Sequence, residues 1–439
     1  MSHIFKELAY IAKWGVGRRG AFTHDKFLRN NERLPLCEIE NLQTIRLVDI
    51  VKHAYEYIPY YGAKYRKAGF NLMDIGYGDW FENLPIITKQ ELRDHFEDII
   101  DQRYRRYMHV STTGGSTGVP TKTGYDRRIP EEAYSWRLQR WFGVNPWDDH
   151  AYVWRDTRSG KIAKLKNALL WWPTRHLKMD ATFITEDGMS DFIKKYNRLK
   201  PAMLQGYVGA ITQLAQFIVD KRLRVYSPKF VWTTSAPLPS SQRNLISQAF
   251  GAPVCDQYGS CEVRWIAAQC PECGGLHVNA EHVRIEFVDD GNQPVARGEY
   301  GRTLLTNLED KVFPLIRYEN GDRGRWLNGQ CPCGRTLPMI DSVKGRESES
   351  FVLPSGKTLN GEFLTTIFDS DPDLVSGFRV VQHKDLNITI EYIPAGDEQD
   401  ILMLIQSFAT KVGDDVRVDS RSVGSIPHDR GKLRYVVKE

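Results

Sequence analysis

The stretch STTGGSTGVPTK, residues 111–122, is the part of this 439-residue chain from which its fold and chemistry can first be inferred. Three glycines, at 114, 115 and 118, permit backbone conformations in which N–H groups approach an anion closely. The hydroxyls between them add donors, and Lys122 adds a positive charge. The stretch lacks the Lys-Ser/Thr pair of the GxxxxGK[ST] pattern. It therefore predicts a phosphate-binding loop of another kind, with a flexible surface loop as the alternative.

Strand and helix patterns alternate downstream of this loop. We expect strands at 152–156 and 230–236, and helices at 190–201 and 208–223. Because strands that alternate with helices usually lie side by side in one sheet, the pattern predicts an α/β fold with a largely parallel sheet.

The two ends of the chain show different secondary-structure patterns. Residues 1–105 are predicted to be largely helical, with a break at Pro59. Residues 281–327 are rich in strand patterns, and three further strand patterns surround one helix near the C-terminus. We therefore expect two domains, a large one over 1–346 and a small α+β domain over 347–439.

The composition is that of an ordinary soluble globular protein, with 41% hydrophobic and 26% charged residues. It excludes a mostly disordered chain, a collagen-like repeat and a disulfide-rich miniprotein. The 59 basic and 55 acidic residues leave a net charge of +4, which argues against a dedicated nucleic-acid binder. No apolar run reaches the length of about 18 residues that spans a membrane, and no signal peptide is evident. These features predict a cytoplasmic protein.

Two segments leave alternatives open. The N-terminus predicts either a packing helix or a membrane-surface helix, because apolar residues share one helical face beside basic ones. These residues are Ile4, Leu8, Ile11 and Val16, with Lys6, Lys13, Arg18 and Arg19. The basic segment 153–179, which contains Trp171 and Trp172, predicts either a contact with a large anionic acceptor or a peripheral helix packed by its tryptophans.

Three more motifs carry groups that could act on a nucleotide. DQYGSCE ends at Glu262, whose carboxylate offers the hard oxygen ligands that Mg²⁺ prefers. PLIRYENGDRGRW contains Asp322, which could accept hydrogen bonds from two ribose hydroxyls, although an Asn-Gly-Asp hairpin turn is the simpler interpretation. IPHDRGKLRYVV contains Lys432, a loop lysine that could place its charge on a reacting phosphate or carboxylate. Taken singly, each motif is also compatible with an ordinary turn or a solvated side chain.

Four of the seven cysteines form two tight pairs, Cys270 with Cys273 and Cys331 with Cys333. Four thiolates satisfy tetrahedral Zn²⁺ and leave no open position for a catalytic water. His277, which follows the first pair, is an alternative to one of the cysteines as a ligand. The sequence thus predicts a structural zinc site, with four reduced and unligated thiols as the alternative.

The order of these motifs resembles that of the adenylate-forming superfamily, which includes acyl-CoA synthetases and luciferases. The resemblance runs from about residue 50 to the C-terminus, and it is strongest to the branch of phenylacetate–CoA ligases and capsular-polysaccharide-type proteins. The matching segments are QGYVGAITQLAQFI, TTSAPLP, FGAPVCDQYGSCE, PLIRYENGD, VKGR and PHDRGKLR. The resemblance implies a large N-terminal domain with parallel and mixed sheets, and a small mobile C-terminal domain.

The resemblance also implies ATP-binding roles for three groups of residues. They are Thr113, Gly114, Gly115, Ser116, Thr117 and Gly118 as the loop over the β- and γ-phosphates, Ser235, Ala236 and Pro237 beside adenine, and Tyr258, Gly259 and Ser260 near adenine and the α-phosphate. Thr117 is counted among the catalytic residues. Pro237 departs from the family, which usually has an acidic residue there.

Four single residues complete the implied site. Glu262 would bind Mg²⁺, and Asp322 would hold the ribose. Arg346 would lie near the ribose and the hinge, and Lys432 would bridge the carboxylate and the α-phosphate during adenylation. The hinge itself departs from the family, because Ser348 and Glu349 stand where an acidic pair is usual.

These roles imply a two-step ligase that uses ATP, Mg²⁺ and a small-molecule carboxylate. The acyl group would pass from an acyl-adenylate to the thiol of coenzyme A. The alternative acceptor is an amine, which would give an amide in surface-polysaccharide or natural-product biosynthesis. A nucleotide-binding scaffold or sensor without catalysis is a third possibility, and retention of both Glu262 and Lys432 argues against it. Neither the carboxylate nor the oligomeric state can be inferred from the sequence.

Overall fold

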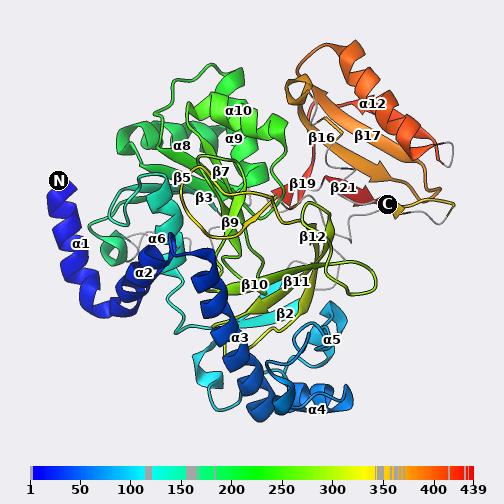
Figure 1. The fold of residues 1–439 in the computed structure, drawn as a ribbon. Helices are drawn as coiled ribbons and strands as arrows, with labels where there is room; N and C mark the ends of the chain where they lie inside the picture. Colours follow the sequence, from blue (N-terminus) through cyan, green and yellow to red (C-terminus); the bar gives the residue numbers. More distant parts are fainter. Residues whose placement is uncertain are drawn as a thin grey trace. The chain divides into compact units, whose positions relative to one another are not determined.

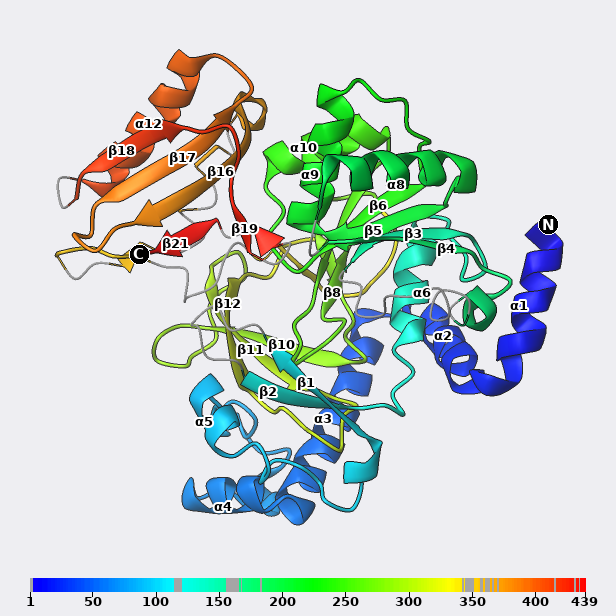
Figure 2. The ribbon, with the colours of Figure 1, turned by 180° about the vertical axis from the view of Figure 1, so that it is seen from behind.

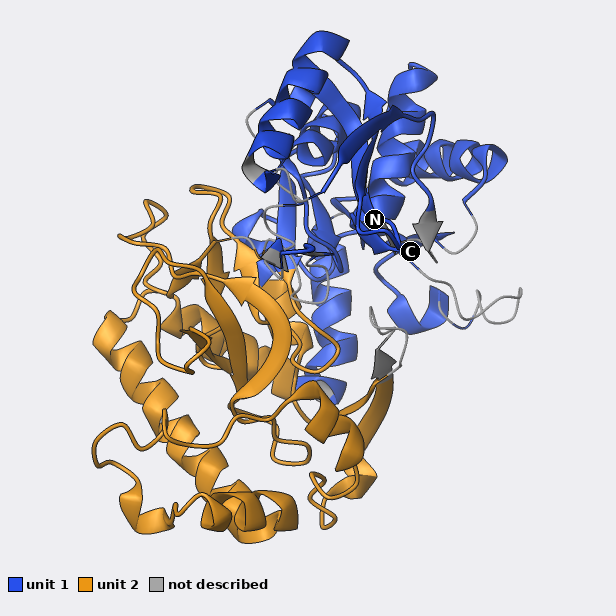
Figure 3. Cartoon of the chain, turned by 90° about the vertical axis from the view of Figure 1, so that its right-hand side faces the viewer, with its two compact units in different colours: residues 1–19, 138–257, 344–439 blue, residues 20–137, 258–343 orange. Residues whose placement is uncertain are grey.

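The computed structural model describes most of the chain. The described residues are 3–439 except 114–120, 155–165, 167, 182–183, 342, 344–350, 356–357, 360–363, 365–366, 369–370, 414–415, 430–431 and 434. They group into two compact units, each made of segments that are far apart in the sequence (Figure 3). Unit 1 contains residues 1–19, 138–257 and 344–439, and unit 2 contains residues 20–137 and 258–343.

The helices and strands follow in chain order. The helices are α1 (His3–Gly17), α2 (Arg19–Asn31), α3 (Leu36–Tyr57), α4 (Pro59–Lys67), α5 (Lys89–Asp94), α6 (Glu132–Trp141), α8 (Glu186–Leu199), α9 (Val208–Asp220), α10 (Ser240–Phe250) and α12 (Glu398–Val412). The strands up to the middle of the chain are β1 (Met108–Thr113), β2 (Thr121–Asp126), β3 (His150–Trp154), β4 (His176–Asp180), β5 (Met203–Tyr207), β6 (Phe230–Thr234) and β7 (Val254–Tyr258).

The remaining strands are short in places. They are β8 (Ala267–Gln269), β9 (Leu276–Val278), β10 (Val283–Val288), β11 (Gly301–Asn307), β12 (Tyr318–Gly324), β13 (Met339–Ile340), β14 (Phe351–Val352), β15 (Thr358–Leu359), β16 (Val375–Gln382), β17 (Ile388–Pro394), β18 (Val418–Ser422), β19 (His428–Asp429), β20 (Lys432–Leu433) and β21 (Val436–Lys438). This mixture of helices and strands confirms the α/β fold class.

The core of unit 1 is a parallel sheet with the strand order β7-β6-β5-β3-β4. Every residue of β6 is buried, as expected for a strand covered on both faces. The helices α8, α9 and α10 run beside this sheet (Figures 1 and 2). Apolar residues of these helices, such as Phe192, Leu214 and Phe250, pack with strand residues such as Val231. The alternation of strands and helices expected for this region is thus confirmed.

The C-terminal segment of unit 1 builds a second sheet with the order β18-β17-β16-β21, against which α12 packs. This is the small α+β unit expected from the sequence. Asn244 Nδ2 of α10 donates a hydrogen bond of 2.9 Å to Asp373 Oδ1, so the segment also contacts the first part of unit 1. Because compactness groups 344–439 with 138–257, a division into domains at 346/347 stays a prediction.

Unit 2 combines helices with antiparallel strands. The strands form the hairpin β1-β2 and the sheet β10-β11-β12, and three further strands pair in the order β13-β9-β8. The helix α3 ends before Pro59, and this proline takes the first position of α4, where its missing N–H costs no hydrogen bond. The predicted helical break at Pro59 is therefore confirmed.

Candidate functional site

The strand β12 presents three polar side chains to one face of its sheet. Tyr318, Asn320 and Asp322 occupy alternate positions, and all three are buried, whereas the residues between them are partly exposed. Gly321 has φ +81°, a conformation that favours glycine, and the register shifts between β11 and β12. The Asn-Gly-Asp stretch is thus an irregular part of a strand, and its interpretation as a hairpin turn was wrong.

Asp322 is held in one orientation by its neighbours. Tyr258 donates a hydrogen bond of 2.8 Å from its hydroxyl to Asp322 Oδ2, and Asn320 Nδ2 donates one of 2.6 Å to the same oxygen. Asn320 Nδ2 also lies 2.8 Å from the Tyr258 hydroxyl, and the Asp322 backbone N–H donates to Asn320 Oδ1 at 3.1 Å. The structure therefore brings together two of the expected site residues and adds Asn320, which the sequence analysis missed.

Glu262 lies at the end of a tight turn in the same unit. The turn is closed by a 2.9 Å bond from the Ser260 N–H to the Val263 carbonyl and by a 2.9 Å bond from the Val263 N–H to Ser260 Oγ. The Glu262 side chain is buried, and its Oε1 accepts a hydrogen bond of 3.3 Å from the Tyr318 hydroxyl. The strand β12 thus connects Glu262 with Asp322.

The short helix α5 places two positively charged side chains near Glu262 and the start of β2. Lys89 Nζ lies 3.7 Å from Glu262 Oε1, and Arg93 Nη1 donates a hydrogen bond of 3.3 Å to Thr121 Oγ1 at the start of β2. The helix begins with a capping box, in which Thr88 and Glu91 satisfy each other's backbone N–H groups. The T-x-x-E pattern of this box is visible in the sequence, but nothing in it indicates that Lys89 lies near Glu262.

The predicted phosphate loop connects β1 and β2. Thr113 is the last residue of β1 and pairs with Thr121, so the two strands define where the loop begins and ends. The loop residues lie outside the described residues: Gly114, Gly115, Ser116, Thr117 and Gly118. Arg93 reaches the base of this loop through Thr121.

The other nucleotide-site candidates belong to unit 1, apart from Gly259 and Ser260, which lie in the turn before Glu262. Ser235, Ala236 and Pro237 follow the buried strand β6. Ser235 has φ +76°, a conformation that costs a non-glycine residue about 1–3 kcal/mol and is often retained at functional sites. The backbone of Lys432 lies in β20, which pairs with β19 and packs beside α9. Arg346 lies outside the described residues.

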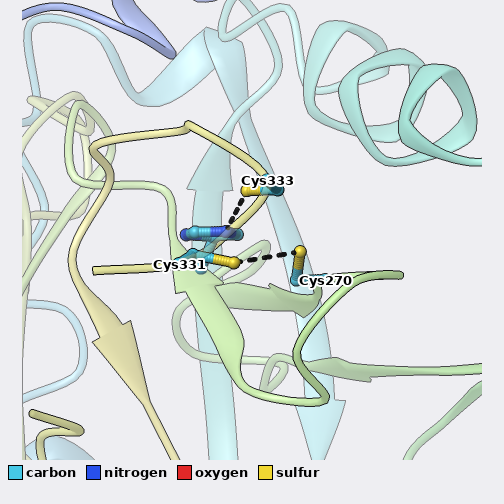
Figure 4. A group of neighbouring side chains, drawn as sticks. Cys270, Cys331 and Cys333 are labelled. Atoms are coloured by element: carbon cyan, nitrogen blue, oxygen red, sulfur yellow. Dashed lines mark hydrogen bonds between the residues drawn. The ribbon is translucent and has the colours of Figure 1, made fainter. Parts of the chain in front are cut away.

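Cysteine and histidine side chains converge at a second place in unit 2. Possible ligand atoms of Cys270, His277, Cys331 and Cys333 all lie within 4.8 Å of one another. Cys270 Sγ is 3.5 Å from Cys331 Sγ, and Cys333 Sγ is 3.3 Å from His277 Nε2. Figure 4 shows the three cysteines of this group pointing toward one another. Cys273 Sγ lies 3.0 Å from Cys331 Sγ but is not a member of the group.

These distances suit a tetrahedral metal ion, because zinc–sulfur bonds of about 2.3 Å place neighbouring ligands about 3.8 Å apart. The other ring nitrogen of His277, Nδ1, is 3.1 Å from the Leu337 carbonyl, a bond that directs Nε2 toward Cys333. Burial lowers the pKa of His277 to about 4, so the imidazole is neutral at pH 7, as a metal ligand must be. The geometry favours His277 over Cys273 as the fourth ligand.

No protein-family model matches the chain. It is 27% identical over 344 residues to the phenylacetate-coenzyme A ligase of Escherichia coli (strain K12), over 73% of this chain and 74% of that protein. It is 25% identical over 331 residues to protein CapK of Staphylococcus aureus, over 73% and 70% of the two chains.

The fold has a close counterpart among solved structures. The crystal structure of 2-hydroxyisobutyryl-CoA ligase in the postadenylation state superimposes with a TM-score of 0.77 at 21% identity, over 94% of this chain and 92% of that one. The fold is that of an adenylate-forming CoA ligase, and the motif order resembles the acyl-CoA synthetase type. Among the proteins compared, the chain is similar in sequence to phenylacetate–CoA ligases and to CapK. The resemblance inferred from the motifs is confirmed.

Proposed function

We propose that the protein is an AMP-forming ligase that activates a carboxylate with ATP and then transfers the acyl group to the thiol of coenzyme A. The observation that carries the proposal is the arrangement along β12, where Asp322 is fixed by Tyr258 and Asn320 while Glu262 is held by Tyr318. A carboxylate fixed in this way can accept hydrogen bonds from ribose hydroxyls, and a second buried carboxylate can bind the Mg²⁺ of a metal-bound phosphate. Relatives named as CoA ligases support the same activity.

In the first step, a substrate carboxylate oxygen attacks the α-phosphorus of ATP, and the bond to pyrophosphate breaks. Asp322 would accept hydrogen bonds from the ribose hydroxyls, so that the α-phosphate is aligned with the incoming carboxylate. The loop between β1 and β2 would hold the β- and γ-phosphates, and Lys432 would stabilise the charge that develops on the α-phosphate. Mg²⁺, bound by Glu262, would supply further charge neutralisation on the phosphates.

In the second step, the thiol of coenzyme A attacks the acyl carbon of the adenylate and AMP leaves. An amine in place of the thiol would give an amide by the same displacement. We propose that the segment carrying Lys432 moves between the two steps, so that the acyl carbon becomes accessible. ATP and reduced thiols both favour the cytoplasm as the site of this reaction.

We further propose that the cysteine–histidine group is a structural zinc site with Cys270, His277, Cys331 and Cys333 as ligands. A complete shell of four protein ligands leaves no position for a reacting water, so the ion would stabilise the fold without taking part in catalysis. The site would connect the loop between β8 and β9 with the segment after β12, which lies about 60 residues further along the chain.

The experiment that tests the activity is carboxylate-dependent exchange of pyrophosphate into ATP, measured with a broad panel of acids. We expect Asp322→Asn and Lys432→Ala to lower the exchange rate by about two to three orders of magnitude. Matched controls are Glu319→Gln, which changes a partly exposed carboxylate of the same strand at a position between Tyr318 and Asn320, and Lys438→Ala, which changes an exposed lysine of β21.

Two results would contradict the proposal. Absence of exchange with every acid would favour a nucleotide-binding scaffold over an enzyme. Exchange at the wild-type rate in Lys432→Ala would remove the role given to this lysine. Once an active acid is known, the loss of free coenzyme A thiol distinguishes an acid–thiol ligase from an amide-forming enzyme, which would consume the acid and ATP only when an amine is added.

A further inference from the structure

The helix α1 packs against unit 1 through its charged and aromatic side chains. Lys6 Nζ forms an ion pair of 2.6 Å with the buried Asp149, and Tyr10 is only 3% exposed. Lys13 Nζ donates hydrogen bonds of 2.7, 2.7 and 2.9 Å to the carbonyls of Leu169, Leu170 and Trp172. The inward face of α1 therefore uses its cations for packing.

The outward face of the same helix is apolar. Ile4, Phe5, Leu8 and Ile11 are exposed to 69%, 48%, 62% and 42%. Their spacing of three and four residues forms one stripe along the helix. A helix on the surface of a globular protein normally turns such a stripe toward the core. In α1 the usual orientation is reversed, and the stripe faces the solvent.

Three exposed apolar residues from a distant part of the chain contact α1 through Lys13. Leu169, Leu170 and Trp172 are exposed to 65%, 46% and 45%, and Lys13 of α1 binds the carbonyls of all three. Arg18 lies 4.2 Å from the ring centre of Trp14 and 5.2 Å from that of Trp171, which strengthens the same contact. We call the four residues of the stripe and these three residues the N-terminal face. Exposed apolar residues that gather in one region of a surface are a common feature of binding surfaces.

The segments that carry the N-terminal face are strongly basic. The described residues 3–20, 166 and 168–178 contain seven lysines and arginines and one acidic residue, whereas the rest of the sequence contains 52 basic and 54 acidic residues. Arg19, Lys166 and Lys178 are exposed. The small net charge of the whole chain thus hides a local positive charge beside the apolar face.

We propose that the N-terminal face docks on the surface of a bilayer that contains anionic lipids. The apolar side chains would enter the boundary between headgroups and acyl chains, and Trp172 would lie at headgroup depth. The exposed cations Arg19, Lys166 and Lys178 would be attracted by the anionic headgroups. Among the described residues no helix has the length and apolarity needed to cross a membrane. The contact proposed here is with the surface alone.

The charge distribution favours a bilayer over a second copy of the chain. Two copies that paired through the N-terminal face would bring the same basic segments together, because a twofold contact uses the same surface on both partners. Like charges at an interface oppose association. A lipid surface supplies both the apolar interior and the negative charge that this face lacks.

Flotation of the full-length protein with vesicles tests the proposal. One set of vesicles contains phosphatidylcholine alone, and the other contains about one third phosphatidylglycerol. We expect the vesicle-bound fraction at low protein concentration to be about tenfold larger with the anionic vesicles, and to fall as the salt concentration rises. Equal binding to both kinds of vesicle, or binding to neither, would overturn the proposal.

Matched variants distinguish vesicle binding through the N-terminal face from nonspecific vesicle binding. The double variant Ile4→Glu/Leu8→Glu should lose most of its vesicle binding, because two charged side chains would enter the apolar boundary. The control is Leu402→Glu/Met403→Glu on α12, whose side chains are exposed to 43% and 61% and are not part of the N-terminal face. The control should bind vesicles like the wild type. Equal loss in both variants would refute the assignment of the face.

Two further measurements exclude a folding defect and a protein partner. Circular dichroism of Ile4→Glu/Leu8→Glu should match that of the wild type. Brominated lipids should quench tryptophan emission less in Trp172→Phe than in the wild type, because Trp172 would lie at headgroup depth. If the wild type is instead a dimer without lipid, and Ile4→Glu/Leu8→Glu is a monomer, the face is an interface between two copies and the membrane proposal is wrong.

Discussion

The choice of the fourth zinc ligand is a prediction that two single substitutions can decide. The structure groups His277 with Cys270, Cys331 and Cys333, and leaves Cys273 outside. We therefore expect His277→Gln to weaken zinc binding and Cys273→Ser to leave it nearly unchanged. Cys273 is the more exposed of the two residues, so its substitution also has the smaller effect on packing.

The expected loss follows from the number of ligands. Structural zinc sites bind with about 10–16 kcal/mol at pH 7, which is about 3 kcal/mol for each of four ligands. Loss of 3 kcal/mol corresponds to an affinity about a hundredfold lower. Burial also raises the pKa of the Cys270 and Cys331 thiols to about 11 in the metal-free protein, so the metal has to displace their protons. Affinity should accordingly rise with pH in the wild type.

The measurement is zinc content by mass spectrometry after desalting, followed by competition with a chromophoric chelator. One zinc per chain is expected in the wild type and in Cys273→Ser. A hundredfold loss in Cys273→Ser with full binding in His277→Gln would refute the reasoning and support a four-cysteine site. Absence of zinc from the wild type, when it is expressed in zinc-supplemented medium, would refute the site itself.

Three further predictions concern charges in unit 2. Burial opposes ionisation of Glu309, but its hydrogen bond to His282 and neighbouring positive charges lower its pKa from the ordinary 4.5 to about 2. The stability that the ionised carboxylate gives is therefore complete above pH 4.5 and is lost as the pH falls through 2. Glu309→Gln should lower the free energy of unfolding by about 3 kcal/mol at pH 7 and make acid unfolding less steep, and an unchanged acid-unfolding profile would contradict this. Arg137→Met leaves the buried Glu281 without its bidentate partner and should lower the free energy of unfolding in urea by about 3–5 kcal/mol, whereas a loss below 1 kcal/mol would show that the pair is dispensable. Lys89→Met removes the cation that competes with Mg²⁺ for Glu262. The Mg²⁺ concentration for half-maximal pyrophosphate exchange should therefore fall about twofold to fivefold. A rise would show that Lys89 assists the metal site instead.

The parts of the fold that the sequence predicts are those with strong local signals. The helix break at Pro59 and the buried strand β6 depend on proline chemistry and on a continuous apolar run, which act over a few residues. The grouping of unit 2 from 20–137 and 258–343 depends on contacts between distant segments, and no local pattern reports these.

The candidate site likewise contains residues that the sequence indicates and residues that only the folded structure reveals. Motif order pointed to Glu262 and Asp322, and both lie near β12. Asn320 escaped notice because an Asn-Gly-Asp sequence is typical of turns, and only the neighbouring strand reveals that it lies in a sheet. Lys89 was missed because an isolated lysine on a short helix carries no local sign of the carboxylate that it faces.

Each unit is built from segments that alternate along the sequence with segments of the other unit, and this has a consequence for biosynthesis. Unit 2 ends at residue 343, and unit 1 combines the first 19 residues with the last 96, so neither can be completed while most of the chain is still on the ribosome. The helix α1 leaves the exit tunnel long before the segments that it packs on, such as Asp149 and the stretch from Leu169 to Trp172. α1 therefore stays without its packing partners in unit 1 until residues 138–257 have been synthesised.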